Sequence, residues 1–255
     1  MPHVRKPAPS GPRRSPRASS DAAALTEIAP HRGIRSFVVR AGRMTAGQER
    51  ALVELWPRYG IDWPPTTLPL DFSLIFGRTA PLTLEIGFGN GATLAHLAAA
   101  NPARNYLGVE VHRPGIGHLL LAAAAANLEN LRIFGRDAVE VLTQAIPAAS
   151  VDEILIQFPD PWPKKRHHKR RLIQPGFALL AAGRLRPGGA LRLATDWEEY
   201  ALHMQEVLNA CPLLKNSAVG AGAIIRPGWR ELTKFEQRGH ELGHAVRDFE
   251  FIRAA

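Results

Sequence analysis

The stretch FPDPWPKKRHHKRR, residues 158–171, places one carboxylate beside an aromatic ring and a block of positive charge. Prolines at 159, 161 and 163 restrict the backbone, so the loop that carries Asp160 is expected to be stiff. Trp162 offers a flat face for stacking a nucleobase, and Asp160 offers a polar group for its edge. Residues 164–171 are all Lys, Arg or His and suit phosphate contacts. The pattern favours a site acting on a nucleic-acid base, the alternative being a proline-stiffened loop with solvated charges.

A glycine-rich turn, LEIGFGNGAT, is the second candidate site. Gly87, Gly89 and Gly91 follow a short apolar run and allow a tight turn and a close approach to a ligand. With Ala92 the turn also fits the dinucleotide fingerprint G-x-G-x-x-G/A. From the glycines alone, an NAD-binding protein, an S-adenosylmethionine-binding protein and a turn without a ligand all remain open.

Three acids near strand ends favour S-adenosylmethionine as the ligand. Glu85 lies inside the apolar run before the glycines, while Glu110 and Asp137 come at the ends of the next two runs. Ligands of open parallel sheets bind at the carboxyl ends of the strands. A buried carboxylate such as Glu85 is costly without a cationic partner, and it would repel a pyrophosphate. Glu110 suits a ribose hydroxyl pair and Asp137 an adenine amine, so S-adenosylmethionine is the expected cofactor.

The elements that must position these residues alternate regularly from Pro81 onward. Apolar runs predict strands at 82–87, 106–111, 131–135, 151–158 and 189–196, and helical patterns lie between and after them at 92–100, 116–130, 137–146, 174–185 and 197–210. A further helix is expected to begin at Thr45, and the residues from 233 onward predict a short helix and a final strand. This order predicts an α/β fold with a doubly wound, mostly parallel, Rossmann-like sheet.

Composition divides the chain into a tail and one domain. Residues 1–30 contain six prolines and no Phe, Trp or Tyr, which predicts a disordered basic tail. Residues 31–255 are expected to form a single domain, with 31–70 as its N-terminal arm. The net charge is +9, of which residues 1–43 contribute +7 and residues 164–171 contribute +6, leaving the rest acidic. The charge indicates a polyanionic partner.

Several functional classes are disfavoured by the sequence. No apolar run reaches the roughly 18 residues of a membrane span. The single cysteine, Cys211, excludes an intramolecular disulfide and a cysteine-based metal cluster. The segment HELGH, residues 240–244, fits a zinc-protease motif, but no further His follows and Gly243 interrupts the supposed ligand helix. We therefore expect a cytoplasmic protein without a metal or a membrane partner.

Six motifs together resemble the bacterial tRNA (guanine-N7)-methyltransferase family, whose members are class I S-adenosylmethionine-dependent enzymes. The motifs are IRSFVVRAGRMTAGQ, LEIGFGNG, GVEVHRPGIG, FPDPWPKKRHHKRRLI, LATDWEEYA and TKFEQRGHELGH, and they extend over residues 32–252. The resemblance implies methyl transfer to N7 of guanine 46 in the variable loop of tRNA. It also implies tRNA as the partner of a monomer or homodimer.

The resemblance assigns roles to individual positions. Cofactor binding falls to Glu85, Glu110, Asp137 and Asp160, beside the three glycines of the turn, and Asp160 is also the expected catalytic residue. Contacts with the substrate guanosine or tRNA are implied for Lys164, Asp196, Thr233, Lys234, Phe235 and Glu236. Further tRNA contacts are implied for Arg166, His167, His168, Lys169, Arg170 and Arg171.

Other functions remain as alternatives. The chain could be a catalytically silent RNA-binding module, which a methylation assay would reveal. It could be an S-adenosylmethionine methyltransferase with a different substrate, which weak salt dependence of substrate binding would reveal. A dehydrogenase is the least favoured alternative and is tested by measuring cofactor binding.

Overall fold

The computed structural model describes residues 36–37, 43–65, 68–230, 236 and 245–255. Contacts divide the chain after Gly33, and Ile34–Ala255 is the unit described below. The tail expected at 1–30, and all of the segment 231–244 except Glu236, lie outside the described residues.

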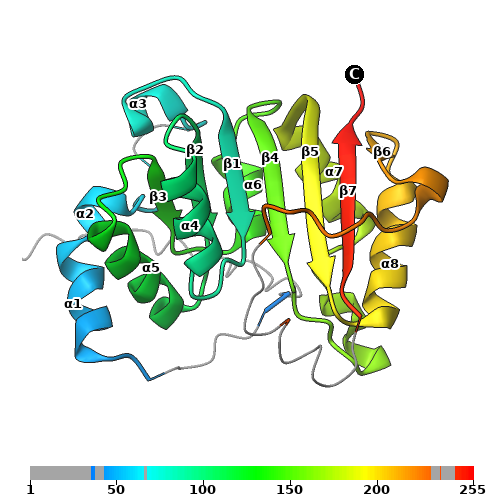
Figure 1. Ribbon diagram of the computed structural model, residues 1–255, viewed down its shortest axis with the longest axis horizontal. Helices are drawn as coiled ribbons and strands as arrows, with labels where there is room; N and C mark the ends of the chain where they lie inside the picture. The colour runs from blue at the N-terminus through cyan, green and yellow to red at the C-terminus, as the bar shows by residue number, and fades with distance from the viewer. Residues whose placement is uncertain (1–35, 38–42, 66–67, 231–235, 237–244) are drawn as a thin grey trace, which may run out of the picture. The chain divides into compact units, whose positions relative to one another are not determined.

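One seven-stranded sheet, in the order β3-β2-β1-β4-β5-β7-β6, forms the centre of this unit (Figure 1). Strands β1 to β5 are parallel, whereas β7 runs antiparallel to both β5 and β6. The mostly parallel α/β sheet expected from the sequence is thus confirmed. The strands are β1 (Leu82–Ile86), β2 (Asn105–Val109), β3 (Leu131–Phe134), β4 (Val151–Gln157), β5 (Leu185–Thr195), β6 (Leu214–Asn216) and β7 (Arg247–Arg253).

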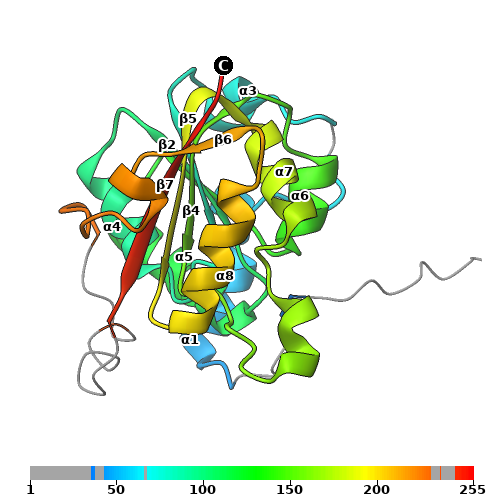
Figure 2. The same cartoon turned by 90° about the vertical axis from the view of Figure 1, so that its right-hand side faces the viewer.

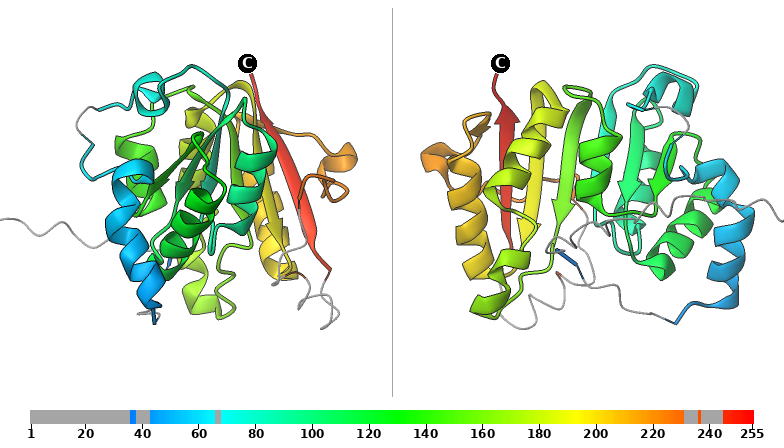
Figure 3. Two further views of the ribbon diagram at one scale, coloured as in Figure 1. Left: turned by 60° about the vertical axis from the view of Figure 1, so that its left-hand side comes forward. Right: turned by 180° about the vertical axis from the view of Figure 1, so that it is seen from behind.

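Helices cover both faces of the sheet. Figure 2 shows the sheet nearly edge-on, with α4 on one side and α6 and α7 on the other, and Figure 3 shows the second face from behind. The first face carries α1 (Ala46–Glu54), α4 (Ala92–Ala100) and α5 (Arg113–Ala125), and the second carries α6 (Ala138–Gln144), α7 (Pro175–Arg184) and α8 (Glu198–Asn209). Shorter helices are α2 (Trp56–Tyr59), α3 (Phe72–Phe76), and the 3-10 helices η1 (Lys165–Arg170) and η2 (Val219–Ala221). Each face buries its own apolar cluster.

Local sequence explains the burial of β1 and the start of α1. All five residues of β1 are buried, as expected for a central parallel strand covered by helices on both faces. Helix α1 begins after Thr45, whose hydroxyl accepts from the backbone N–H of Gln48 while the Gln48 side chain accepts from the backbone N–H of Thr45. The helix start predicted at Thr45 is therefore confirmed.

The structure differs from the sequence prediction at two strands. Strand β5 begins at Leu185 rather than at Gly189, because Val151 pairs with Leu185 across a register shift in β4. The three-residue strand β6 was not predicted, since so short a segment has no periodicity and depends on its pairing with β7.

The N-terminal arm lies against the edge of the sheet. Gly60 forms a parallel bridge with Ile133 of β3, and the N–H of Ile61 donates to the carbonyl of Ile133 at 2.9 Å. The arm therefore covers the outer strand on that side.

Candidate active site

A cleft of about 210 Å³ lies at the carboxyl ends of β1 to β4. It brings together four predicted site residues, each from a different strand end: Gly87, Glu110, Asp137 and Asp160. Ser36 and Phe37 of the N-terminal arm also line it. Glu110, Asp137 and Asp160 thus share one edge of the sheet, whereas Glu85, Gly89 and Gly91 do not line the cleft.

The glycine turn joins β1 to α4 with three left-handed backbone conformations. Gly87, Gly89 and Gly91 have φ angles of 72°, 59° and 74°, which disfavour any residue with a side chain. No atom lies within 4 Å of where a Cβ would stand at Gly87 or Gly89. At Gly91 a Cβ would lie 2.6 Å from the Leu119 side chain of α5. The first two glycines leave space for a ligand, while the third allows close helix packing.

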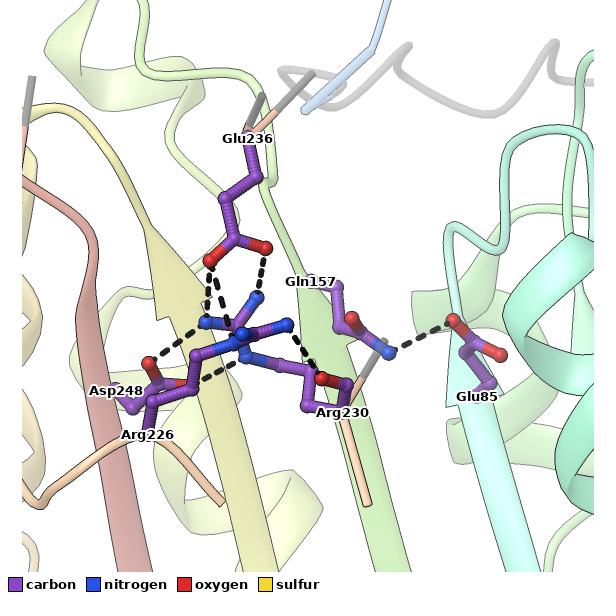
Figure 4. Close-up of polar contacts among 6 residues, drawn as sticks. All are labelled: Glu85, Gln157, Arg226, Arg230, Glu236 and Asp248. Carbon is purple, nitrogen blue, oxygen red and sulfur yellow. Dashed lines mark hydrogen bonds and ion pairs between the residues drawn. The ribbon is translucent and has the colours of Figure 1, made fainter. Parts of the chain in front are cut away.

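Glu85 is a buried acid to which the described part of the chain offers one weak polar partner. Its side chain lies in β1, is 3% exposed, and points toward Gln157 of β4 (Figure 4). Its Oε1 accepts from Gln157 Nε2 at 3.4 Å, and its buried Oε2 has no hydrogen-bond partner among the described residues. Burial, together with the neighbouring Glu110 carboxylate, raises the pKa of Glu85 to about 8. A cation entering this site would stabilise the ionised form of Glu85.

Glu110 and Asp137 organise the two loops beside the glycine turn. Glu110 Oε2 accepts from the N–H of Gly89 at 2.9 Å, and Oε1 accepts from the N–H groups of Val111 and His112 at 2.7 and 3.0 Å. Asp137 is the N-cap of α6 and accepts from the N–H of Val139 at 2.8 Å. These bonds fix both carboxylates at the rim of the cleft.

The loop after β4 holds Asp160 in an exposed position between two strained residues. Phe158 and Trp162 have φ angles of 49° and 46°, which are unfavourable for bulky side chains. Such conformations persist where the surrounding contacts determine them, and they cluster at functional sites. The acid thus lies between two residues with unfavourable backbone conformations.

The Trp162 side chain is already engaged within the protein. Its indole N–H donates to the carbonyl of Ser36 at 3.0 Å, and the Arg170 guanidinium lies 4.7 Å from its ring centroid. His167 meets the ring edge-on at 5.8 Å. The ring face predicted to stack on a base is therefore partly occupied by Arg170.

The basic run forms η1 directly after this loop. Lys164, Lys165, Arg166 and Lys169 are exposed, and His167, His168 and Arg170 are half-buried. Desolvation lowers the pKa of His167, and the neighbouring charges of η1 and Lys164 lower it further. Arg171 differs from its neighbours because its side chain is only 2% exposed. The structure thus separates Arg171 from the rest of the predicted tRNA-contacting run.

Two further expected substrate residues lie near this edge of the sheet but outside the cleft lining. Asp196 is half-buried and follows β5, the strand next to β4, so it shares the sheet edge with Asp160. Lys164 is exposed and stands at the start of η1. Thr233, Lys234 and Phe235 lie outside the described residues.

Glu236 lies in a buried ion-pair cluster rather than at the surface (Figure 4). Both of its carboxylate oxygens accept from Arg230, at 2.6 and 2.9 Å. Arg230 also reaches Asp248 of β7 at 2.7 and 2.9 Å, and its guanidinium lies 5.7 Å from the centroid of the Phe158 ring. This cluster connects Glu236 to the start of the Asp160 loop.

Three residues at the site were not anticipated as functional. Gln157 could have been identified by its position as the last residue of β4, where it contacts Glu85. Gly115 could also have been identified from the sequence, because a glycine early in a helix suggests a close approach by a neighbouring backbone. The sequence around Arg230 gives no indication of its burial, since a lone arginine in a loop is ordinarily exposed.

Gly115→Ala is expected to destabilise the protein by about 1–3 kcal/mol, because overpacking forces the backbone to shift. A Cβ at Gly115 would lie 1.9 Å from the carbonyl oxygen of Gly89 in the glycine turn. The matched control is Gly176→Ala, which also follows a proline at a helix start but has no atom within 4 Å of the new Cβ. Urea unfolding followed by circular dichroism measures both variants, and equal free energies of unfolding would contradict the prediction.

No described helix is long and apolar enough to cross a membrane. Within the same residues, no group of three or more His, Cys, Asp or Glu side chains is arranged to hold a metal ion.

Comparison with known proteins identifies the family. Residues 79–249 match the family model described as "Putative methyltransferase". The tRNA (guanine-N(7)-)-methyltransferase of Methylococcus capsulatus is 54% identical over 90% of this chain and 98% of its own length, and that of Shewanella woodyi is 52% identical over 87% and 92%. Among solved structures, the 16S rRNA methyltransferase KamB has a TM-score of 0.55 at 15% identity, covering 76% of this chain and 99% of its own, which supports the fold alone. The glycine turn, the acidic cleft and these identities lead to one conclusion: the chain belongs to the tRNA (guanine-N7)-methyltransferase family.

Proposed function

We propose that this protein transfers a methyl group from S-adenosylmethionine to N7 of guanine 46 in the variable loop of tRNA, forming 7-methylguanosine. The observation that carries the proposal is the position of Asp160, which lines the same cleft as Glu110 and Asp137 and is followed directly by the basic helix η1. Asp160 thus lies between the proposed cofactor site and the proposed phosphate-binding surface. The names of the relatives support this reading of the chemistry.

The residues in and beside the cleft fit S-adenosylmethionine. Glu85 has a buried oxygen that accepts no hydrogen bond from the described residues, and a cationic group would satisfy it. Gly87 and Gly89 leave open space beside it. Glu110 is placed to hold a ribose, and Asp137 an adenine amine. When bound, this cofactor supplies an electrophilic methyl group on a sulfonium.

The acids near the β4 and β5 ends suit the chemistry of guanine. N7 is a lone-pair acceptor, so no residue has to remove a proton from it. Asp160 stabilises the positive charge that develops on the base, which is an electrostatic role. In this proposal Asp196 accepts from the N1–H and N2–H groups of guanine, and adenine would leave it without those donors. Alignment of the base is the main task of the site.

The exposed side chains of η1 supply affinity for tRNA. Lys164, Lys165, Arg166 and Lys169 present cations next to the Asp160 loop. Contacts from these groups to phosphates place the substrate without reading its sequence, and they make binding dependent on salt.

The proposal is tested by incubating unmodified tRNA with the protein and S-adenosylmethionine labelled in its methyl group. Mass spectrometry of the nucleosides should find the label in 7-methylguanosine, and fragment mapping should place it at position 46. A tRNA with adenine at that position should remain unlabelled. The absence of label from every nucleoside, despite tight tRNA binding, would overturn the proposal in favour of an RNA-binding module.

The affinity for S-adenosylmethionine is expected to rise with pH up to about 8. Below its pKa of about 8 the Glu85 carboxyl carries a proton, and a bound cation must displace it. The dissociation constant should therefore fall by up to about tenfold per pH unit between pH 6 and 8 and then level off. Calorimetric titrations at several pH values, each in two buffers of different ionisation enthalpy, measure the affinity and the proton release together.

Glu85→Gln is the control for this pH dependence. It keeps the shape of the side chain but cannot titrate, so only the titration of the cofactor's own amine remains. An unchanged pH slope and unchanged proton release in this variant would contradict the role of Glu85.

A further inference from the structure

Arg171 stands apart in the basic run because its charge is buried. Its side chain is 2% exposed, whereas Lys164, Lys165, Arg166 and Lys169 are exposed. A phosphate of bound RNA cannot reach a guanidinium in this position without displacing the side chains around it. A buried cation also needs partners within the protein, because its desolvation is otherwise uncompensated.

The partners of Arg171 lie in the Asp160 loop and in α8. Its Nε donates to the carbonyl oxygen of Pro161 at 2.9 Å. Its Nη2 lies 3.1 Å from His168 Nε2 and 3.5 Å from Glu199 Oε1. The guanidinium also lies 5.0 Å from the ring centroid of Tyr200, which is fully buried. The side chain thus joins the loop to the body of the domain.

The hydrogen bond from Arg171 to the Pro161 carbonyl acts on the loop that carries Asp160. Pro161 lies between Asp160 and Trp162, and Trp162 has an unfavourable φ of 46°. A strained loop keeps its conformation only when other contacts hold it. The Pro161 carbonyl has a buried, charged donor, and such hydrogen bonds are stronger than neutral ones. Arg171 therefore acts one residue away from the acid at the centre of the site.

We propose that Arg171 is a positioning residue, which holds the Asp160 loop in its active conformation and does not contact tRNA phosphates. The proposal rests on the function proposed above and changes the role that family resemblance gave to this position. Lysine could carry the charge, but it lacks the planar group that meets the Pro161 carbonyl, His168 and the Tyr200 ring together.

The test compares Arg171→Lys and Arg171→Gln with Lys169→Gln, all in the full-length chain. Lys169 is the matched control because it is exposed and lies two residues before Arg171 in the same basic run, and its replacement removes one charge, as Arg171→Gln does. We measure kcat and KM for tRNA methylation and the slope of log Kd for tRNA against log salt concentration. Thermal unfolding of each variant reports whether it is folded.

A positioning role predicts that both Arg171 variants lose kcat by about tenfold or more, while their salt slope equals that of the wild type. Lys169→Gln should raise KM and reduce the slope by about one phosphate contact. If Arg171→Gln does not fold, Arg171→Lys carries the test by itself. The proposal is overturned if Arg171→Lys keeps the wild-type kcat, if Arg171→Gln reduces the salt slope as Lys169→Gln does, or if neither Arg171 variant folds. A wild-type protein without methylation would instead refute the proposed function.

Discussion

Asp160→Asn is expected to lower kcat for methyl transfer by about 10²–10³-fold, the loss typical for removal of one preorganised electrostatic group. Asparagine keeps the size of the side chain, and the loop remains held by Pro161 and Trp162 through their bonds to Arg171 and Ser36. The loss should therefore come from the missing negative charge. Single-turnover methylation of tRNA at saturating S-adenosylmethionine separates this effect from weaker cofactor binding.

Glu129→Gln is the control for this experiment. Glu129 is an exposed acid just before β3, at the opposite edge of the sheet from the cleft, so its neutralisation changes the net charge equally. It should leave the single-turnover rate unchanged. An Asp160→Ala protein with the full rate would show that the carboxylate does not act on the reaction.

Arg230→Ala is expected to reduce the free energy of unfolding by about 3–5 kcal/mol, because it leaves two buried carboxylates without their cation. Glu236 is fully buried and Asp248 is 4% exposed, and both accept hydrogen bonds from this one guanidinium (Figure 4). Burial raises the pKa of Asp248, and Arg230 opposes that rise. Urea unfolding at pH 7 measures the loss.

The chain offers a matched control at Arg226. Its side chain is 42% exposed and lies 3.5 Å from the same Glu236 carboxylate, so Arg226→Ala should cost about 0–1 kcal/mol, as exposed ion pairs do. Arg230→Ala should also lower the methylation rate, since Arg230 contacts Phe158 at the start of the Asp160 loop. Equal stability losses in the two variants would contradict the importance of burial.

The sheet could be predicted because its signals are local. The run LTLEI ends at a glycine, and each later apolar run is followed by a helical pattern, so the parallel order follows from chain connectivity. The acids at the strand ends were predicted for the same reason, since parallel strands carry Glu110 and Asp137 to one edge. Strand β6 and helix η1 depend on neighbours distant in sequence and gave no such signal.

The burial of particular charges could not be predicted. Arg171 lies within eight consecutive basic or His residues, and its type and spacing resemble those of its exposed neighbours. Its burial against the Tyr200 ring and its bond to the Pro161 carbonyl distinguish it. The partners of Arg230 are 6 and 18 residues away in sequence, and nothing local links an arginine to Glu236 and Asp248. Long-range packing decides both cases.

The bridge between Gly60 and Ile133 restricts how two copies of this protein can associate. An outer strand with free N–H and C=O groups can extend its sheet into a second molecule. Here the arm already pairs with Ile133, in the middle of a four-residue strand. The other outer strand, β6, has only three residues. Neither edge of the described sheet offers a long template, so extension of this sheet into a second molecule is disfavoured.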